Sequence, residues 1–196
     1  MAVTVSVTAT KIDITSTDGV QETWDTCVTA INAHTAGTVT GTGTSGDPYT
    51  ITAASYRELE FSSGVKVKFV AGTYTDWQWG TTSGTYVIFD ASSGCEIEIE
   101  QGCNFNFGST GTYKRGYVYL YGKVTAQASS GNEIVFENYR SMYIYSRDTQ
   151  VMDYVFLKNC TYSSGYMIYL GLMTYTTIRP VCSYTNFKVF NDNHGL

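Results

Sequence analysis

The chain has 196 residues, of which 43% are hydrophobic and 15% charged, and its formal net charge is −5. This length fits one domain with a substantial core. The acidic balance, without any cluster of Lys and Arg, argues against a nucleic-acid partner, and the lack of a run of about 18 apolar residues argues against a membrane span.

Cysteine usage and the N-terminus bear on the compartment. The five cysteines are Cys27, Cys95, Cys103, Cys160 and Cys182. Their number is odd and none are in CxxC spacing, so we expect buried free thiols in a reducing compartment. Neither His34 nor His194 lies near a cysteine pair, so we expect no metal and no cofactor. The N-terminus starts with Met1 and shows no secretory signal.

Residues 1–17 form the first predicted element. Apolar residues alternate with polar ones from Val3 to Ile14, which indicates a strand or extended arm with one buried face. The segment lies outside the repeats described below. Two interpretations therefore stay open: the arm pairs with another chain, or it packs on its own domain.

Residues 18–37 predict a short amphipathic helix over about 19–35. Asp18 is a candidate N-cap, with Gln21 three residues later as in a capping box. One face at helical spacing carries Val20, Trp24, Cys27, Val28 and Ile31. A stack of strands exposes its core and its strand edges at each end. We therefore expect this helix to cap the N-terminal end.

After a turn-rich connector, three short patterns recur in one order five times over residues 38–196. The first pattern is an apolar strand at 49–51, 86–89, 118–121, 142–145 and 166–169. The second lies at 59–61, 97–99, 124–126, 151–152 and 178, and the third at 65–69, 103–107, 134–136, 154–157 and 187–190. Gly64 and Gly102 precede the third pattern in equivalent places, which suggests tight corners.

Three short strands cannot bury their apolar faces alone, so each repeat must stack on the next. Winding them into a coil gives three parallel sheets around one narrow core. A spacing of 24 residues predicts that Leu120, Ile144 and Ile168 form one column. The sequence thus favours an all-β chain: a parallel β-helix of about five three-strand turns, with an N-terminal arm and a capping helix.

Several stretches carry a family resemblance: LEFSSGVKVKF at 59–69, YGKVTAQASSGNEIVFENY at 121–139 and MDYVFLKNCTY at 152–162. They resemble right-handed parallel β-helix proteins of the pectin-lyase-like superfamily. Asn138 and Asn159, after successive third strands, look like that family's asparagine ladder. The resemblance implies a rigid right-handed coil, as found in pectin-degrading enzymes, adhesins and bacteriophage tail and capsid proteins. It implies no particular activity.

Charged residues alternate with apolar ones in two stretches. Glu96, Glu98 and Glu100 should share the outer face of one strand, with adjacent carboxylates roughly 7 Å apart. That is in the range of a glycosidase pair. A solvated face is the plainer interpretation, and a calcium ion between the rows of Glu60 and Glu98 is a weaker one. Lys66 and Lys68 should also face outward and protect the surface.

Aromatic residues supply the candidate contacts. Tyr119, Tyr121, Tyr143, Tyr145 and Tyr169 should form an outer face, with Tyr121, Tyr145 and Tyr169 in one column. Such a face suits a subunit interface, packing under a loop of the same chain, or sugar binding.

A second aromatic pair lies in the long first insertion. Trp77 and Trp79 are two residues apart there, where they suit sugar or partner contact, or simple loop packing.

No nucleotide loop, GxSxG motif or paired aspartate appears, and two histidines leave little room for a catalytic triad. We therefore expect no enzyme and no catalytic residues. The preferred interpretation is a virion structural protein, assembled in the bacterial cytoplasm. It would be a bacteriophage capsid decoration (cement) protein or short fibre. We expect such a protein to form a homotrimer and to contact a capsid protein. The alternative is a carbohydrate-active enzyme or a sugar-binding adhesin.

Overall fold

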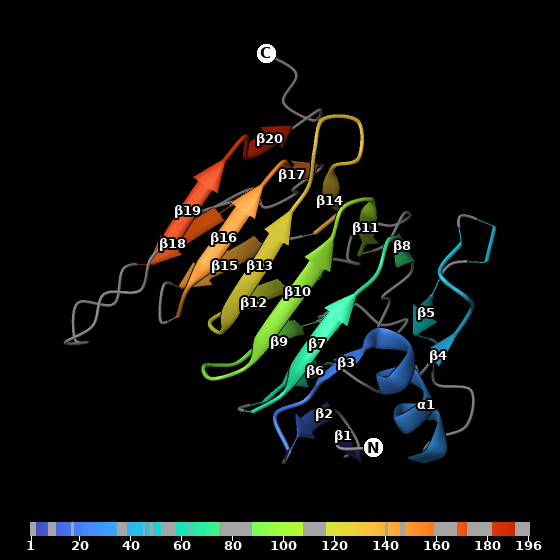
Figure 1. Ribbon diagram of the computed structural model, residues 1–196. Helices are drawn as coiled ribbons and strands as arrows, with labels where there is room; N and C mark the ends of the chain where they lie inside the picture. Colours follow the sequence, from blue (N-terminus) through green and yellow to red (C-terminus); the bar gives the residue numbers. More distant parts are fainter. Residues whose placement is uncertain are drawn as a thin grey trace.

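The computed structural model describes a mostly β chain with parallel sheets (Figure 1). The described residues are 3–7, 11–16, 18–34, 39–44, 46–47, 49–51, 58–62, 64–74, 88–107, 117–139, 141–145, 148–158, 168–171 and 182–190. Within them α1 is the one α-helix, and no helix there is long and apolar enough to cross a membrane.

Three sheets carry nearly all of the strands. The first contains, in spatial order, β1 (Val3–Val7), β2 (Lys11–Ser16), β6 (Glu58–Phe61), β9 (Ile88–Ala91), β12 (Tyr117–Leu120), β15 (Ser141–Tyr145) and β18 (Ile168–Gly171). The second contains β3 (Gln21–Thr23), β7 (Lys66–Phe69), β10 (Glu96–Glu100), β13 (Lys123–Gln127), β16 (Gln150–Asp153) and β19 (Cys182–Thr185). The third contains β8 (Gly72–Tyr74), β11 (Cys103–Asn106), β14 (Ile134–Glu137), β17 (Val155–Lys158) and β20 (Lys188–Phe190).

From β6 to β20 the chain visits the three sheets in a fixed order, and each strand pairs in parallel with its equivalent in the next turn. This confirms the predicted stacking of three-strand repeats. In Figure 1 the second sheet faces the viewer, and its colours run in chain order from β3 to β19. Within these three sheets, the pair β1–β2 is the one antiparallel pair.

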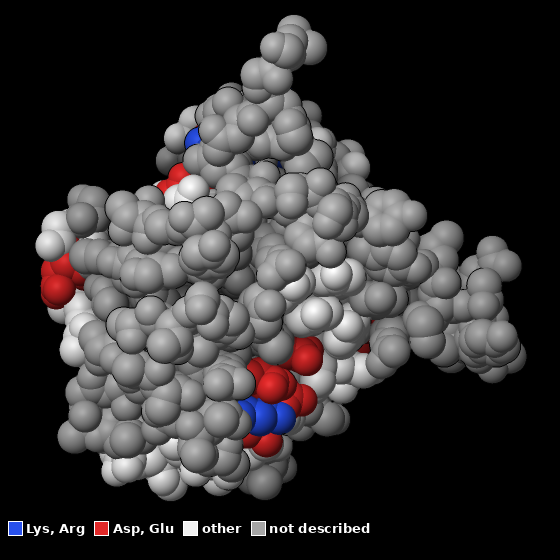
Figure 2. All heavy atoms as spheres, turned by 180° about the vertical axis from the view of Figure 1, so that it is seen from behind, with Lys and Arg blue, Asp and Glu red and all other residues white. Residues whose placement is uncertain are grey.

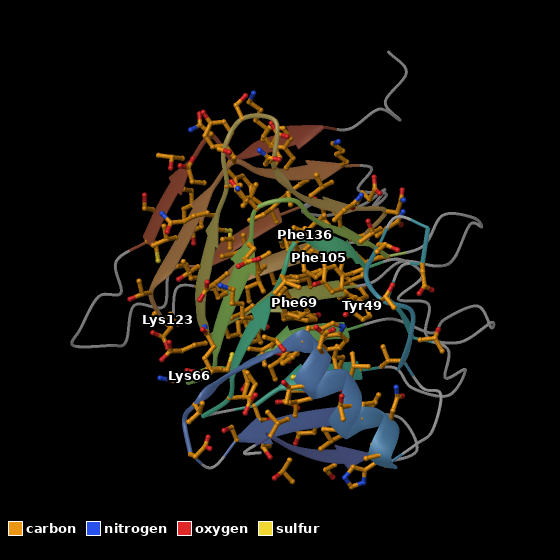
Figure 3. All side chains as sticks on the ribbon, turned by 45° about the vertical axis from the view of Figure 1, so that its right-hand side comes forward. Tyr49, Lys66, Phe69, Phe105, Lys123 and Phe136 are labelled. Carbon is orange, nitrogen blue, oxygen red and sulfur yellow. The ribbon has the colours of Figure 1, made fainter. Side chains whose placement is uncertain are left out.

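Alternation along each strand separates the core from the surface. In β10, Ile97 and Ile99 are buried while the glutamates between them are partly exposed. Four aromatic rings stack along the turns in the core. Figure 3 labels three of these residues, Tyr49, Phe105 and Phe136, inside the sheets. Tyr49, Tyr74, Phe105 and Phe136 have successive centroid distances of 5.3, 4.8 and 4.8 Å. The last two distances match the spacing of neighbouring strands, so the ladder of backbone pairs also aligns the rings.

The first turn differs from the predicted assignment. The 59–61 stretch belongs to the first sheet and 66–69 to the second, while Gly72–Tyr74 supplies the third strand. The 49–51 stretch is not a repeat strand, because β5 (Thr50–Ile51) pairs antiparallel with β4 (Val39–Thr40). The sheet to which each strand belongs depends on its pairing partners, and the pattern of residues alone does not identify those partners.

The corners correct the predicted equivalence of Gly64 and Gly102. Gly64 lies between β6 and β7 and is matched by Gly94 and Gly122 at the same corner of later turns, whereas Gly102 lies between β10 and β11. At Gly122 the backbone passes very close to the preceding turn. A Cβ atom on Gly122 would lie 2.4 Å from the Cys95 sulfur and 2.6 Å from the Ser92 carbonyl oxygen. Only glycine leaves room for the next turn at this corner.

The last turn shifts the predicted column. Leu120 pairs with Ile144 as expected, but Ile144 pairs with Leu170, and Ile168 lies opposite Met142. Ile178, the predicted second strand of the last repeat, lies outside the described residues. Strand β19, which begins at Cys182, pairs with β16 and supplies the strand of the second sheet in that turn.

The helix begins later than predicted. α1 spans Trp24–His34, and Gln21–Thr23 forms strand β3 against β7 instead of a first helical turn. Asp18 accepts a hydrogen bond from the Val20 backbone N–H, and Val20 is 54% exposed rather than part of the buried face. Ladder hydrogen bonds to β7 override the local capping signal.

The N-terminal end of the coil is closed by chain outside the repeats. Strands β1 and β2 pair within this chain, because β1 lies antiparallel to β2 and β2 lies parallel to β6. The helix covers the core, with Trp24 stacked on Phe69 at 5.4 Å between ring centroids. At the third sheet, the Thr73 N–H donates to the Gly43 carbonyl and the Tyr49 N–H donates to the Thr73 carbonyl.

Candidate functional site

The outer face of the second sheet carries a ladder of opposite charges. Parallel register places Lys66, Glu96 and Lys123 side by side on three successive turns. The Glu96 carboxylate lies 3.2 Å from the Lys66 Nζ and 3.1 Å from the Lys123 Nζ. Both lysines point outward from this sheet in Figure 3. The hydrogen bonds from Lys123 and then Lys66 hold the pKa of Glu96 below its ordinary value.

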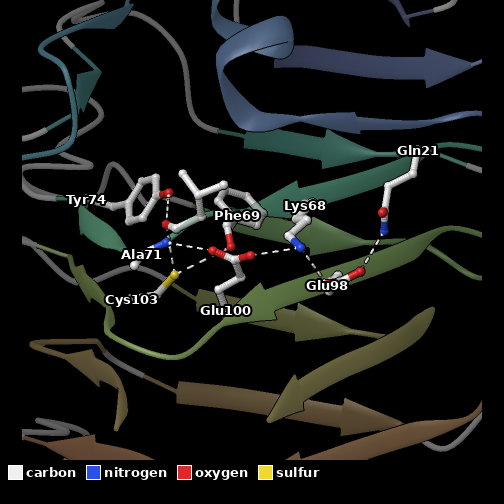
Figure 4. A network of polar contacts seen from close by, with 9 residues as sticks. Gln21, Lys68, Phe69, Ala71, Tyr74, Glu98, Glu100 and Cys103 are labelled. Atoms are coloured by element: carbon white, nitrogen blue, oxygen red, sulfur yellow. Dashed lines mark hydrogen bonds and ion pairs between the residues drawn. The ribbon is translucent and has the colours of Figure 1, made fainter. Parts of the chain in front are cut away.

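A second column continues the ladder (Figure 4). The Lys68 Nζ lies 3.0 Å from Glu98 and 2.8 Å from Glu100. Gln21 of β3 donates to Glu98 at 2.9 Å, and the Ala71 N–H donates to Glu100 at 3.3 Å. The Gln21 hydrogen bond, followed by that from Lys68, lowers the pKa of Glu98, and the bonds to Glu100 and Glu98 raise the pKa of Lys68.

This arrangement bears on acid–base catalysis. A glycosidase of the two-carboxylate type needs one carboxyl group with a raised pKa to protonate the leaving group. Here Lys68 joins Glu98 and Glu100, and Glu98 is held ionised. The pair resembles a structural ion-pair network more than an acid and a base.

A shallow groove of about 480 Å³ lies on the same face, beside this network. Its polar lining includes Glu98, Glu100, Thr125, Gln127 and Asn132. Amide and hydroxyl groups donate hydrogen bonds while carboxylates accept them, so the groove offers both kinds of group to a hydroxyl-rich ligand. Among the residues that the structure describes, neither an aromatic nor a cationic side chain lines the groove.

The proposed calcium position between Glu60 and Glu98 is wrong, because the two glutamates lie on different sheets. On the first sheet, Glu60 forms an ion pair with Lys11, and Glu58 lies 3.9 Å from the same Nζ. Across the described ranges, no group of three or more His, Cys, Asp and Glu residues is placed to hold a metal ion.

The outer face of the first sheet carries the tyrosine face, which we define as Tyr117, Tyr119, Tyr121 and Tyr143. Tyr119 stacks on Tyr143 of the next turn, with centroids 4.8 Å apart and planes at 12°. Tyr117 and Tyr121 flank Tyr119 at 6.1 and 5.7 Å. All four are partly exposed. Of the predicted face, Tyr119, Tyr121 and Tyr143 therefore lie together on the outer side of the first sheet.

The predicted column of Tyr121, Tyr145 and Tyr169 is incorrect. Tyr169 pairs with Tyr143, and Tyr145 lies opposite Gly171. The column is therefore Tyr119, Tyr143 and Tyr169. The side chains of Tyr145 and Tyr169 lie outside the described part of the structure, as do Trp77 and Trp79 in full.

An acidic row continues the same column toward the N-terminal end. Asp13 of β2 lies opposite Glu60 of β6, which lies opposite Asp90 of β9, and Asp90 lies opposite Tyr119. Figure 2, seen from behind Figure 1, shows a basic side chain surrounded by acidic ones. Sequence reasoning missed this continuity, although the alternating KIDI and ELEF segments suggest two matching strands.

The cysteines in the described chain are free. Cys27, Cys95 and Cys103 are buried, and burial raises each pKa to about 12. Such thiols are poor nucleophiles. Cys182 is partly exposed, and Cys160 lies outside the described residues.

Comparison with known proteins gives no relative: no family model, no curated protein and no solved structure matches the chain.

Proposed function

We propose that this chain is a non-enzymatic structural protein that binds partners through the outer faces of a right-handed parallel β-helix. Its concrete form is a bacteriophage capsid decoration (cement) protein or short fibre, assembled as a homotrimer in the bacterial cytoplasm. Each strand returns to its own sheet after visiting the other two. Connections of this kind between parallel strands are right-handed in nearly all proteins, which supports the proposed hand.

The observation that carries the proposal is the tyrosine face. Tyr119 and Tyr143 form a stacked pair that stays partly exposed on a sheet. Tyrosine suits protein contacts because its ring is large and stiff and its hydroxyl tolerates water. The pairing of the strands already holds these tyrosine side chains in a row. They therefore lose little further conformational entropy when a partner binds.

Two further observations support a structural role. The outward glutamates of the second sheet are engaged by lysines rather than held as an acid and a base. Three buried free cysteines fit a protein that folds in a reducing cytoplasm.

The oligomeric state tests the proposal. Size-exclusion chromatography with light scattering should give a trimer for the wild-type chain and a monomer for Tyr119→Ser/Tyr143→Ser. The control is Tyr154→Ser, which removes a partly exposed tyrosine at a corner between the second and third sheets. The control should remain trimeric. A wild-type monomer at every concentration would overturn the homotrimer.

Particle composition tests the virion assignment separately. Mass spectrometry of purified phage particles should find the chain at a fixed ratio to the capsid protein. Its absence from such particles would reject the decoration and fibre roles.

The groove favours a second candidate, a carbohydrate-active enzyme or sugar-binding adhesin. Its hydrogen-bonding groups suit a polysaccharide, and Gln127 is exposed at its edge. A glycan array read with the wild-type chain and with Gln127→Ala separates the two functions. Groove-dependent binding or cleavage of a polysaccharide would favour this candidate over the structural protein.

A further inference from the structure

The link between β2 and β3 contains a dipeptide that occurs nowhere else in the chain. Of the 19 glycines, a single one follows an aspartate or asparagine, and it is Gly19 after Asp18. Glycine has no side chain to shield its backbone nitrogen. At this position the nitrogen is therefore unusually accessible to the carboxyl group of the preceding residue.

The structure leaves this dipeptide open to solvent. Asp18, Gly19 and Val20 are all exposed. Nothing lies within 4 Å of the place that a Cβ atom on Gly19 would occupy, and the φ angle of Gly19 is 66°. In the described part of the chain, no hydrogen bond engages the Gly19 N–H. The nitrogen is thus neither covered nor held in a strand.

The carboxyl group of Asp18 bends over the same stretch of backbone. Its Oδ1 accepts hydrogen bonds from the Val20 N–H at 2.9 Å and from the Ser16 Oγ at 3.2 Å. The first bond closes an Asx turn, in which the side chain folds toward the backbone that follows it. The carboxyl carbon is therefore held on the side of the peptide unit that contains the Gly19 nitrogen.

We propose that Asp18–Gly19 is a site of spontaneous isoaspartate formation in the folded protein. The Gly19 nitrogen attacks the carboxyl carbon of protonated Asp18. The N–Cγ bond forms, the nitrogen gives up its proton and the hydroxyl group leaves Cγ, so that a water molecule is released and a succinimide ring closes.

Hydrolysis of the ring consumes a water molecule and completes the reaction. Water that adds at Cγ breaks the new N–Cγ bond and restores aspartate. Water that adds at the main-chain carbonyl carbon of Asp18 breaks the original peptide bond and leaves the chain running through Cβ. The two steps together change neither the composition nor the oxidation state of the chain.

The product should loosen the strand that follows. Isoaspartate lengthens the main chain by a methylene group and removes the Asx turn, because Cγ becomes part of the backbone. Strand β3 begins directly afterwards, pairs with β7 and places Gln21 against Glu98 at 2.9 Å. We therefore expect modification to weaken this end of the second sheet.

Isotope labelling tests the inference. The folded wild-type chain is stored in water enriched in heavy oxygen, digested in ordinary water and mapped by mass spectrometry. Ring opening in either direction leaves a heavy oxygen atom on Asp18, and fragmentation separates isoaspartate from aspartate. We expect label and isoaspartate at Asp18. Asp13 and Asp153 are internal controls that should stay unlabelled, because Ile14 and Tyr154 follow them.

Two substitutions at Asp18 give opposite expectations. Asp18→Asn keeps an oxygen that can accept from Val20 and releases ammonia instead of water, so label should appear faster. Asp18→Glu keeps the charge but would have to close a larger ring, so the label should be lost. Label that persists in Asp18→Glu, or equals that at Asp153, would overturn the inference.

The wild-type chain unfolded in urea shows whether the fold permits the reaction. Label in the unfolded chain and none in the folded chain would reject the site. Hydrogen exchange measures the structural effect: after storage, the amides of Gln21–Thr23 should exchange faster, whereas those of β16 should not change. Unchanged exchange in β3 of the modified protein would reject the loosening of this strand.

Discussion

The hydroxyl of Tyr184 donates a hydrogen bond of 2.7 Å to the side-chain Oε1 of Gln150, which is buried in the core. The Nε2 of Gln150 donates to the carbonyl oxygens of Leu120 and Gly122 at 2.9 and 3.3 Å. One polar side chain thus links three successive turns. Inside a narrow apolar core, such a group holds the turns in register because every shift would leave it unsatisfied.

Removing the Tyr184 hydroxyl should destabilise the last turn. Tyr184→Phe keeps the ring but deprives buried Gln150 of this donor, so we expect the free energy of unfolding to fall by about 1 kcal/mol. Urea titration measures it. Tyr154→Phe is the matched control and should change stability by less than about 0.5 kcal/mol. Equal losses in the two variants would show that the bond to Gln150 is unimportant.

Tyr154 itself lies in the left-handed region, with φ of 52°, at the single-residue corner between β16 and β17. The equivalent corner of the next turn has Asn186, with φ of 46°. Asparagine tolerates this conformation better than tyrosine. Tyr154→Asn should therefore raise the free energy of unfolding by about 0.5–1 kcal/mol.

Tyr154→Ala separates strain from side-chain loss, because alanine remains strained at this φ and should give no gain. Urea titration of the two variants side by side is the measurement. A stability gain with alanine equal to that with asparagine would assign the effect to the tyrosine ring and not to the backbone.

The sequence predicted the repeats well where the loops between equivalent strands have equal length. Val118 and Met142 are 24 residues apart and do pair. Met142 and Ile168 are 26 residues apart and also pair, so a fixed period of 24 places the last turn two residues out of register. Backbone pairing sets the register of a coil, and loop length can vary freely around it.

The candidate site was predicted in part for a related reason. The alternation of apolar and charged residues correctly predicted that Glu96 and Glu98 point outward. The residues beside them, however, depend on which sheet each strand joins. With β6 assigned to the wrong sheet, Glu60 was expected beside Glu98, whereas Lys66 and Lys68 are the actual neighbours. A row of like charge was therefore predicted where the structure has ion pairs.

The Glu96 ion pairs predict a pH dependence of stability. The pKa of Glu96 is lowered in the folded chain from an ordinary value of 4.5. Ionised Glu96 therefore stabilises the fold above that pH, and the contribution is lost as the pH falls through the lower folded-state pKa. Glu96→Gln should lower stability by about 0.2–1 kcal/mol at neutral pH and low salt. At acidic pH the difference should disappear.

A double-mutant cycle of Glu96→Gln with Lys123→Met isolates the pair. Urea titrations at neutral and acidic pH, each at low and high salt, give the coupling free energy. We expect a favourable coupling that shrinks with salt and with acid. A coupling that is the same at both pH values would mean that packing, not charge, joins the two side chains.

The internal aromatic stack predicts the largest stability effect. Phe105 lies between Tyr74 and Phe136, with centroids 4.8 Å from each, and is buried. Phe105→Leu keeps an apolar side chain but loses two stacked contacts, each worth about 0.5–1.5 kcal/mol. We therefore expect the free energy of unfolding to fall by about 1–3 kcal/mol.

Phe156→Leu on the outer side of the third sheet is the control, because Phe156 is partly exposed and Lys188 lies 5.3 Å from its ring centroid. Its loss should be the smaller of the two in urea titration. Since Phe105 joins turns through the core, its replacement should also lower the cooperativity of unfolding, seen as a smaller dependence on urea concentration. Equal losses for Phe105→Leu and Phe156→Leu would contradict a stabilising role for the stack.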